Sequence, residues 1–314
     1  EVALASMSLS NQSVGVVRGK TTLAKSSLAG YSAGNDIDQE FGLWGQVFGS
    51  TATQDDRDGE SGYDATTYGL VFGYDVLSKY DDHKNNIKGI AFTYANANVE
   101  SDSANNQKTD IDSVQLSFYN HNFNKNNLGF YNEQIANVAF NMHNSTRFIE
   151  AISQKTSTKY NSMELGAQFT VGHNKKTSFY DVIAGPSLSL RYGYLITEDY
   201  EETGEAGLKV QTDDFETLAA TLNYNIMGKI DLDNNTSIFP RFNIGWIRNL
   251  KTEGSSADVG FVAGGKSTKT TSTDLIENIF NLGAQINVPH GDNVFNVRYD
   301  LHSGDGFSSH GASL

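Results

Sequence analysis

One short stretch of the sequence fits a phosphate-binding motif. Residues 260–267 read GFVAGGKS and satisfy G-x-x-x-x-G-K-[ST], in which backbone amides cradle phosphates and the lysine reaches them. Such a loop needs a buried strand before its glycines and a helix after its Lys-Ser pair. Here polar KTEGSSAD precedes the glycines, and TKTTSTD, a poor helix former, follows. We therefore expect a surface loop, whose tip could be a short hairpin, and no nucleotide.

Other residues whose types could support catalysis or metal binding give equally weak evidence for a site. His302, Ser303 and Asp305 are close in sequence, but a hydrolase needs its serine, histidine and acid to converge in space, and a polar loop is the favoured interpretation. Segment 231–242 opens like a calcium loop, yet it has Thr and Phe where Gly and Glu are required. The seven histidines lack metal-ligand spacing. The sequence predicts no enzyme, no metal and no cofactor.

Composition narrows the class of protein. The 314 residues can form two ordinary domains or one large β-domain. Acidic side chains outnumber basic ones by 37 to 23, so the net charge of −14 disfavours nucleic acid as a partner. There is no cysteine, which excludes disulfides and thiolate metal sites. No run approaches the roughly 18 apolar residues of a membrane helix, and the first residues lack a signal peptide's basic and apolar regions. A soluble protein and a membrane β-barrel both remain open.

Alternation of apolar and polar residues, the signal of half-buried strands, dominates the chain. It occurs in segments 67–77, 87–95, 162–172, 187–194, 217–226, 239–247, 279–288 and 294–301. Their apolar faces carry repeated aromatic residues, as lipid-facing barrel walls do. The residues that we expect to face lipid are Tyr68, Leu70, Phe72, Tyr74, Leu190, Tyr192 and Trp246.

The polar faces of these strands separate a barrel from a soluble sandwich. A sandwich would expose many Lys and Glu, whereas these faces carry mainly Gly, Ser, Thr, Asn and Gln with isolated charges. We interpret this face as a polar lumen, with a soluble β-sandwich or barrel as the alternative. The charged candidates for the lumen are Arg191, Arg241, Arg298, Glu164, Asp75 and Asp300. They could pair with one another or with a helix in the lumen, or they could be solvated there.

Connection lengths point the same way. We count about 12 strands, joined alternately by long polar loops and short turns. Long loops at one rim and short turns at the other are typical of outer-membrane barrels. Ahead of the strands lie about 40 residues, in which 16–30 could form a helix that ends at Gly30 or could be a flexible linker. The fold expected is an all-β transmembrane antiparallel barrel.

Several motifs then resemble a known family. FGLWGQVFGSTATQDDRDGESGYDATTYGLVFGYD at 41–75 is similar to the opening hairpin of the autotransporter β-domain, the translocator of type V secretion. GPSLSLRYGYLITEDYEETG at 185–204 resembles its central strand and the following loop, and FPRFNIGW and HSGDGFSSHGASL resemble its later strands. The resemblance runs from about residue 41 to the end of the sequence, and its details look most like the branch from obligate intracellular Gram-negative bacteria.

The resemblance implies both an architecture and partners. Residues 1–40 would be a linker and lumen helix leading from an exported passenger, and 41–314 a translocator barrel in the bacterial outer membrane. The implied partners are the protein's own passenger domain, the outer-membrane assembly machinery and outer-membrane lipid, with no nucleic acid and no nucleotide. A passive outer-membrane pore, an adhesin barrel acting through its own loops, and a soluble β-rich enzyme are the alternatives.

Two departures from the family pattern carry expectations of their own. Family members end in an alternating strand with a C-terminal aromatic residue, whereas this sequence ends in GASL, so we expect a truncated last strand. Asn11 is the only asparagine in residues 1–30, and its surroundings do not match the Asn-Asn site of the self-cleaving branch. Self-cleavage is therefore not expected.

Overall fold

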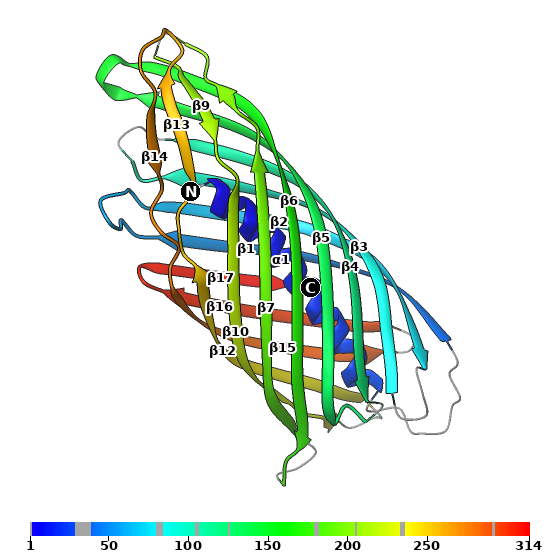
Figure 1. Ribbon diagram of the computed structural model, residues 1–314. Coiled ribbons are helices and arrows are strands. Elements are labelled where there is room, and N and C mark those ends of the chain that lie inside the picture. Colours follow the sequence, from blue (N-terminus) through cyan, green and yellow to red (C-terminus); the bar gives the residue numbers. More distant parts are fainter. Residues whose placement is uncertain are drawn as a thin grey trace.

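The computed structural model describes residues 2–314 apart from 29–38, 80–83, 104–106, 125, 179–181, 205, 233–235 and 291–292. These residues form a closed antiparallel barrel of 12 strands around one helix, α1 (Val2–Leu28) (Figure 1). The all-β barrel with an N-terminal helix is therefore confirmed. No helix in the described part of the chain is long and apolar enough to cross a membrane.

The barrel wall follows the chain almost without interruption. Its strands are β1 (Gln39–Gln54), β2 (Tyr63–Lys79), β3 (Lys84–Ser101), β4 (Lys108–Asn124), β5 (Gly129–Ile149), β6 (Gln154–Lys176), β7 (Ile183–Thr197), β10 (Phe215–Met227), β12 (Thr236–Lys251), β15 (Asn278–His290), β16 (Asn293–Gly304) and β17 (Phe307–Ser313). Short β11 (Ile230–Leu232) pairs with the start of β12.

Two pairings close the sheet. β10 pairs with β12 from Leu218↔Lys251 to Met227↔Arg241, and β1 pairs with β17 from Phe48↔Ser313 to Gln54↔Phe307. The last strand is short, as the sequence predicts, because β17 has 7 residues while β16 has 12. The closure is incomplete at the short-turn end, because β17 does not pair with Gln39–Gln46 of β1 or with residues 293–297 of β16.

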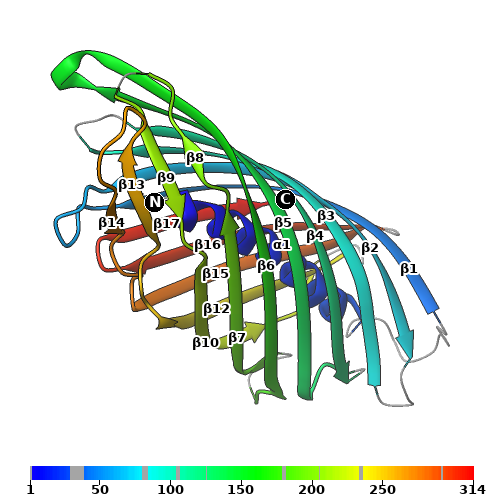
Figure 2. The ribbon, with the colours of Figure 1, turned by 45° about the horizontal axis from the view of Figure 1, so that its top comes forward.

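The two rims differ as expected mainly through β7–β10 and β12–β15, because β5 and β6 extend so far that only residues 150–153 connect them. One rim, the long-loop rim, carries the connections β1–β2, β3–β4, β5–β6, β7–β10, β12–β15 and β16–β17, and the other, the short-turn rim, carries the turns between the remaining neighbours. Elements within the long loops are the short helix η1 (Glu150–Ile152) and the strands β8 (Tyr200–Glu201), β9 (Leu208–Thr212), β13 (Ser256–Phe261) and β14 (Thr268–Thr271). The four strands form a separate rim sheet in the order β14-β13-β9-β8 (Figure 2).

The stretch GFVAGGKS lies in this rim sheet. It runs from the end of β13 through a turn to β14, so strand rather than helix follows the Lys-Ser pair. Gly264 and Gly265 adopt φ values of +105° and +127°, which favour glycine. The structure thus gives these glycines a role in a hairpin turn, and the motif match is a coincidence of turn chemistry.

Helix α1 is longer than the sequence predicts. The expected start at residue 16 is wrong, because the helix begins at Val2. Its first half contains many serines, which weaken both helix propensity and any apolar stripe. In the barrel Ser6, Ser10 and Ser13 are buried while Ser8 and Asn11 are exposed, so polar residues lie on both the buried and the exposed side of the helix. The residues expected to link the helix to the wall, 29–38, lie outside the described residues.

The aromatic residues singled out from the sequence lie on the outer surface. Phe72 is 58% exposed, and Tyr68, Tyr74, Leu190, Tyr192 and Trp246 are also exposed. Leu70 is half-buried and lies between Tyr68 and Phe72 on the same face of β2. Burial alternates with exposure along the neighbouring strands as well, so apolar side chains cover the outside and polar ones turn inward.

Inward glycines lie beneath aromatic rings of the adjacent strand. A Cβ atom on Gly73 would come within 2.2 Å of the Trp44 ring, and one on Gly89 would come within 2.3 Å of the Tyr119 ring. The Trp44 indole then donates a hydrogen bond to the Tyr119 hydroxyl at 3.0 Å. The Gly and aromatic residues that alternate in the sequence therefore form interlocking pairs on the lumen wall.

An outer wall in contact with hydrocarbon predicts a large penalty for a charge at mid-strand. Phe72→Arg, midway along β2, should lower the free energy of unfolding in lipid vesicles by about 2–4 kcal/mol. The volume-conserving Phe72→Leu should cost less than about 1.5 kcal/mol. Guanidinium titrations of the barrel in vesicles measure both, and equal stability of the two variants would contradict a lipid-facing wall.

The interlocking pairs predict coupling between Gly73 and Trp44. Gly73→Val should destabilise the barrel by about 1–3 kcal/mol, because the added atoms overlap the indole ring. Trp44→Leu combined with Gly73→Val should recover part of this loss, since the ring is gone. Simple additivity of the two changes in the same titration would show that the ring does not limit residue 73.

Candidate functional site: the helix-filled lumen

Helix α1 occupies the space inside the barrel (Figures 1 and 2). Its first residues, 2–6, line a cavity of about 590 Å³ at the long-loop rim, together with rim-sheet and loop residues. Its later residues approach the short-turn half of β2 and β5, where Lys20 contacts Asp75 and Arg18 contacts Glu133. The helix thus crosses the lumen with its N-terminus directed to the long-loop rim.

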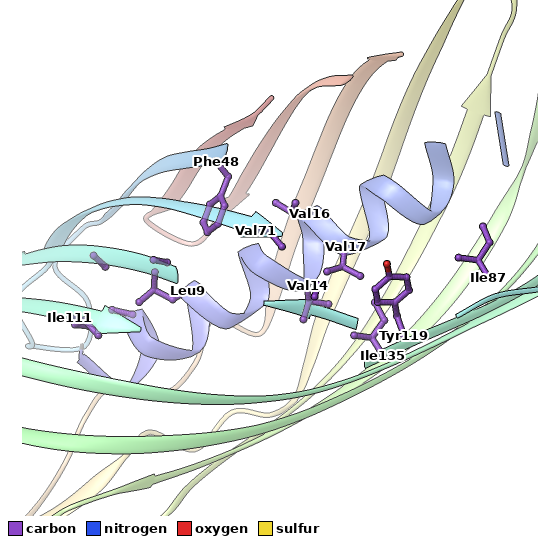
Figure 3. Close-up of a cluster of buried hydrophobic side chains, with 14 of the residues drawn as sticks. Leu9, Val14, Val16, Val17, Phe48, Val71, Ile87, Ile111, Tyr119 and Ile135 are labelled. Carbon is purple, nitrogen blue, oxygen red and sulfur yellow. The ribbon is translucent and has the colours of Figure 1, made fainter. Parts of the chain in front are cut away.

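An apolar stripe of α1 packs on the wall. Leu9, Val14 and Val17 are almost completely buried, at 2%, 2% and 0% exposure. They contribute to one cluster with apolar side chains from β1 to β5 (Figure 3). The wall residues of this cluster include Phe48, Val71, Ala91, Ile111, Tyr119 and Ile135. Burying a side chain of this size stabilises the docked helix by about 1.5–3 kcal/mol.

Small polar residues lie between the apolar ones on this buried side of the helix. The Ser13 hydroxyl lies 2.6 Å from that of Thr93, and Gln115 donates to Ser13 at 3.1 Å. The Asn137 amide donates to Ser10 at 2.9 Å. Short side chains allow the helix to lie close to a wall of amides and hydroxyls, and these hydrogen bonds satisfy groups that would otherwise be buried without partners.

Glu133 on β5 is the main charged contact of the helix. Its carboxylate accepts a hydrogen bond from Arg18 Nε at 3.0 Å and one from the Thr21 hydroxyl at 2.7 Å. His121 Nδ1 lies 3.1 Å from the same carboxylate. The Glu133 side chain is only 5% exposed, so removal of its cationic partner would leave a buried charge.

Glu133 and Arg18 are not among the residues predicted from the sequence. Alternation along FYNEQIANVAF places Glu133 on the same inward face as Ile135 and Asn137. Arg18 lies in the predicted helix, but nothing in a single sequence indicates which residue 115 positions away it meets. Alternation thus predicts which residues of β5 face inward, but it does not predict the contact between Arg18 and Glu133.

Two of the six predicted lumen charges form a buried pair. Glu164 on β6, with an exposed fraction of 0%, lies 3.6 Å from Arg191 on β7. Arg191 also donates to the Ser10 hydroxyl of α1 at 3.4 Å. The pair therefore contacts the helix through the guanidinium group.

Three more of the predicted lumen charges contact α1 directly or contact a residue that does. Asp75 lies 3.5 Å from Lys20 and accepts a hydrogen bond from the Tyr119 hydroxyl at 3.1 Å. Arg298 donates to the carbonyl of Gly15 at 2.8 Å and pairs with Asp300 at 2.6 Å. Five of the six thus engage the helix directly or through one neighbour.

Arg241 is the sixth, and it binds the wall. It donates to the Asn225 side chain at 2.7 Å. It also lines a cavity of about 60 Å³ with Arg18, Arg298 and Glu133. The lumen near the short-turn rim therefore carries three guanidinium groups, which line this cavity together with Glu133.

The mouth at the long-loop rim includes stacked aromatic rings and an ion pair between β5 and the rim sheet. Tyr160 stacks on Tyr200 with ring centroids 4.2 Å apart. Arg147 binds Glu202 through both carboxylate oxygens, at 3.2 and 2.5 Å, and so ties the end of β5 to the rim sheet. Burial, with a smaller contribution from the charge of Glu202, raises the pKa of Tyr200 to about 12, so this phenol stays protonated.

Catalytic arrangements do not emerge from this geometry. His302 and Ser303 are successive residues of β16, so their side chains point to opposite faces of the wall. Among the described residues, no group of three or more His, Cys, Asp or Glu is placed to hold a metal ion. What the lumen offers is a binding surface for a helix.

Comparisons with known proteins give the family. The family model described as Autotransporter beta-domain matches residues 43–300. Outer membrane protein B of Rickettsia prowazekii is 23% identical over 93% of this chain, and outer membrane protein A of Rickettsia conorii is 23% identical over 90%. The chain spans only 18% and 14% of the length of these two relatives.

Solved structures share the fold. The β-domain of the Bordetella autotransporter BrkA superposes with a TM-score of 0.65 and 15% identity, covering 87% of this chain and 97% of that one. The translocator domain of NalP from Neisseria meningitidis gives a TM-score of 0.63 and 14% identity, covering 97% and 95%. The chain belongs to the autotransporter β-domain family, which consists of translocator barrels of the bacterial outer membrane and not of enzymes.

Proposed function

We propose that this barrel exports a passenger that precedes α1 and afterwards anchors it at the cell surface through α1. The observation that carries the proposal is the direction of the helix, whose N-terminus reaches the long-loop rim. In outer-membrane barrels the long loops are extracellular. A polypeptide continuing from residue 2 would therefore emerge on the outside.

The proposal divides the chain into two functional units. Residues 1–40 would be the linker and lumen helix that follow the passenger, and 41–314 the translocator barrel. The abrupt change from helix to continuous wall strands supports this division. The lumen charges would hold the helix after export, with Glu133 and its contact to Arg18 as the strongest single attachment.

A second role of α1 would be to seal the lumen. Leu9, Val14 and Val17 pack on the wall, and Ser10 and Ser13 hydrogen-bond to it, so the helix fills space that water and solutes would otherwise occupy. A passive pore would need this space to be open. The filled lumen therefore favours the anchored translocator over the pore.

The proposed partners follow from the same arrangement. They are the passenger ahead of residue 2, outer-membrane lipid around the exposed apolar wall, and the assembly machinery that inserts the barrel. The apolar side chains on the outer face support the contact with lipid. The assembly machinery is proposed because the strands must close into a sheet within the membrane.

The seal predicts a difference in conductance. The complete chain in planar bilayers should show low conductance, and a chain lacking residues 2–28 should show a large, steady one. Glu133→Ala should raise the frequency of brief openings, because it removes the carboxylate that accepts hydrogen bonds from Arg18 and Thr21 of the helix.

Glu277→Ala is the matched control for conductance. Glu277 pairs with Arg248 near the long-loop rim, where both side chains are substantially exposed. Exposed pairs contribute about 0–1 kcal/mol, so this variant should conduct like the unaltered protein. Identical conductance with and without residues 2–28 would show that α1 does not seal the barrel.

Export predicts surface display of a fused reporter. A reporter joined ahead of residue 2, behind a secretion signal, should become accessible to external protease. Ala52→Pro should abolish display, because Ala52 pairs with both β17 and β2 and proline removes a ladder hydrogen bond. Ala52→Ser should leave display unchanged. A reporter that stays protected in cells with correctly folded barrel would contradict the proposal.

A further inference from the structure

The outer wall is hollowed across β3 to β7. Along one row of paired residues Phe118 is opposite Ala136, Ala136 is opposite Ala167, and Ala167 is opposite Tyr192. The two alanines thus form a floor between larger side chains. The resulting open groove has a volume of about 860 Å³, and Phe169 and Leu190 continue its apolar lining.

A cluster of amide side chains borders this groove on the side of the short-turn rim. Asn86 donates hydrogen bonds to Asn120 at 2.6 Å and to Asn122 at 2.7 Å. Asn120 donates to Gln134, and Gln134 donates to Asn132 at 2.5 Å. These five residues, the amide cluster, lie on the outward face of β3, β4 and β5, where a lipid-facing wall is normally apolar.

A lysine without a charged partner lies beside the amide cluster. Lys88 lines the groove, is exposed, and forms no ion pair in the described part of the chain. Lys84 on β3 and Lys175 on β6 share the outward face at the same end. In the described parts of β3 to β6, no carboxylate faces outward at this end.

The opposite end of these strands carries both signs of charge, because Lys108, Lys155 and Lys159 face outward there. Glu100, Asp110 and Asp112 face outward near the long-loop rim, where Lys108 pairs with Glu100 at 2.8 Å. In the described parts of these strands, lysines without outward carboxylates therefore lie only at the short-turn end, in a chain whose net charge is −14. This arrangement selects for an anionic group at the short-turn rim, which faces the periplasm in outer-membrane barrels.

We propose that the groove and the amide cluster bind one phospholipid with an anionic headgroup from the periplasmic leaflet. An acyl chain lies over Ala136 and Ala167, where it supplies dispersion contacts that these small side chains cannot make with each other. The headgroup phosphate lies beside Lys88 and accepts hydrogen bonds from amide N–H groups at the edge of the cluster. The lysine and the amide donors lie where the headgroup would be, and the apolar groove lies where the acyl chain would be.

Lipid retention tests the proposal. The complete barrel is exchanged into micelles containing equal amounts of phosphatidylglycerol and phosphatidylcholine with identical chains, and bound lipid is counted by native mass spectrometry. One phosphatidylglycerol should be retained in preference to phosphatidylcholine. Lys88→Gln should reduce this preference about fivefold, as expected for one lysine near an anionic headgroup.

Filling the groove tests the chain-binding part. Ala136→Phe should lower retention of both lipids, whereas Ala284→Phe on β15, also on the outward face, should not. Lys108→Gln, at the long-loop end, is the matched control for charge. Each variant is first checked for the shift in gel mobility on boiling that marks a folded barrel.

The contrary outcomes are distinct. Equal retention of the two lipids by the unaltered protein would overturn the headgroup assignment. An equal effect of Lys108→Gln and Lys88→Gln would show that charge acts from anywhere on the wall. A second copy of the chain bound in place of lipid, and lost in Ala136→Phe, would make the groove a contact between barrels.

Discussion

A strand in hydrocarbon cannot leave its backbone N–H and C=O groups unpaired, and the rest of this structure depends on that constraint. Twelve strands satisfy most of it through neighbour pairing and the junctions of β1 with β17 and of β10 with β12, while Gln39–Gln46 of β1 lie beyond the reach of the short β17. Closure in turn fixes the two faces of every strand. The outside must be apolar, and the inside becomes a lumen wider than the wall's own side chains fill.

Helix α1 occupies the part of the lumen that the side chains of the wall do not fill. A helix satisfies its own backbone, so only its side chains need to match a polar wall. This explains why small hydroxyl residues such as Ser10 and Ser13 are buried, and why Leu9, Val14 and Val17 gather where the wall turns apolar. The charged contacts add direction. Arg18, bound to Glu133, and Lys20, near Asp75, keep the C-terminal half of the helix toward the short-turn rim. Buried ion pairs contribute little net stability, but they can specify one arrangement over others.

The sequence predicts the wall better than its contents. Alternation identified outward aromatic residues such as Phe72 and inward charges such as Glu164, because a two-residue period is enforced along a whole strand. The first half of α1 was not predicted, since polar residues such as Ser10 and Asn11 lie on both its buried and its exposed side. The contact of Arg18 with Glu133 and the pairing of β13 with β9 were not predicted for another reason. Both join segments far apart in the chain, and a single sequence does not record which segments meet.

The position of α1 inside the lumen is the central claim, and a disulfide tests it most directly. The chain has no cysteine, so Ser13→Cys with Thr93→Cys introduces a single pair at hydroxyls 2.6 Å apart. In outer membranes isolated from cells, this pair should oxidise and leave a cross-linked band that reductant removes. Ser13→Cys with Phe92→Cys, whose second thiol faces outward, should stay reduced. A folded barrel in which the Ser13–Thr93 pair stays reduced under the same oxidant would contradict a helix seated in the lumen.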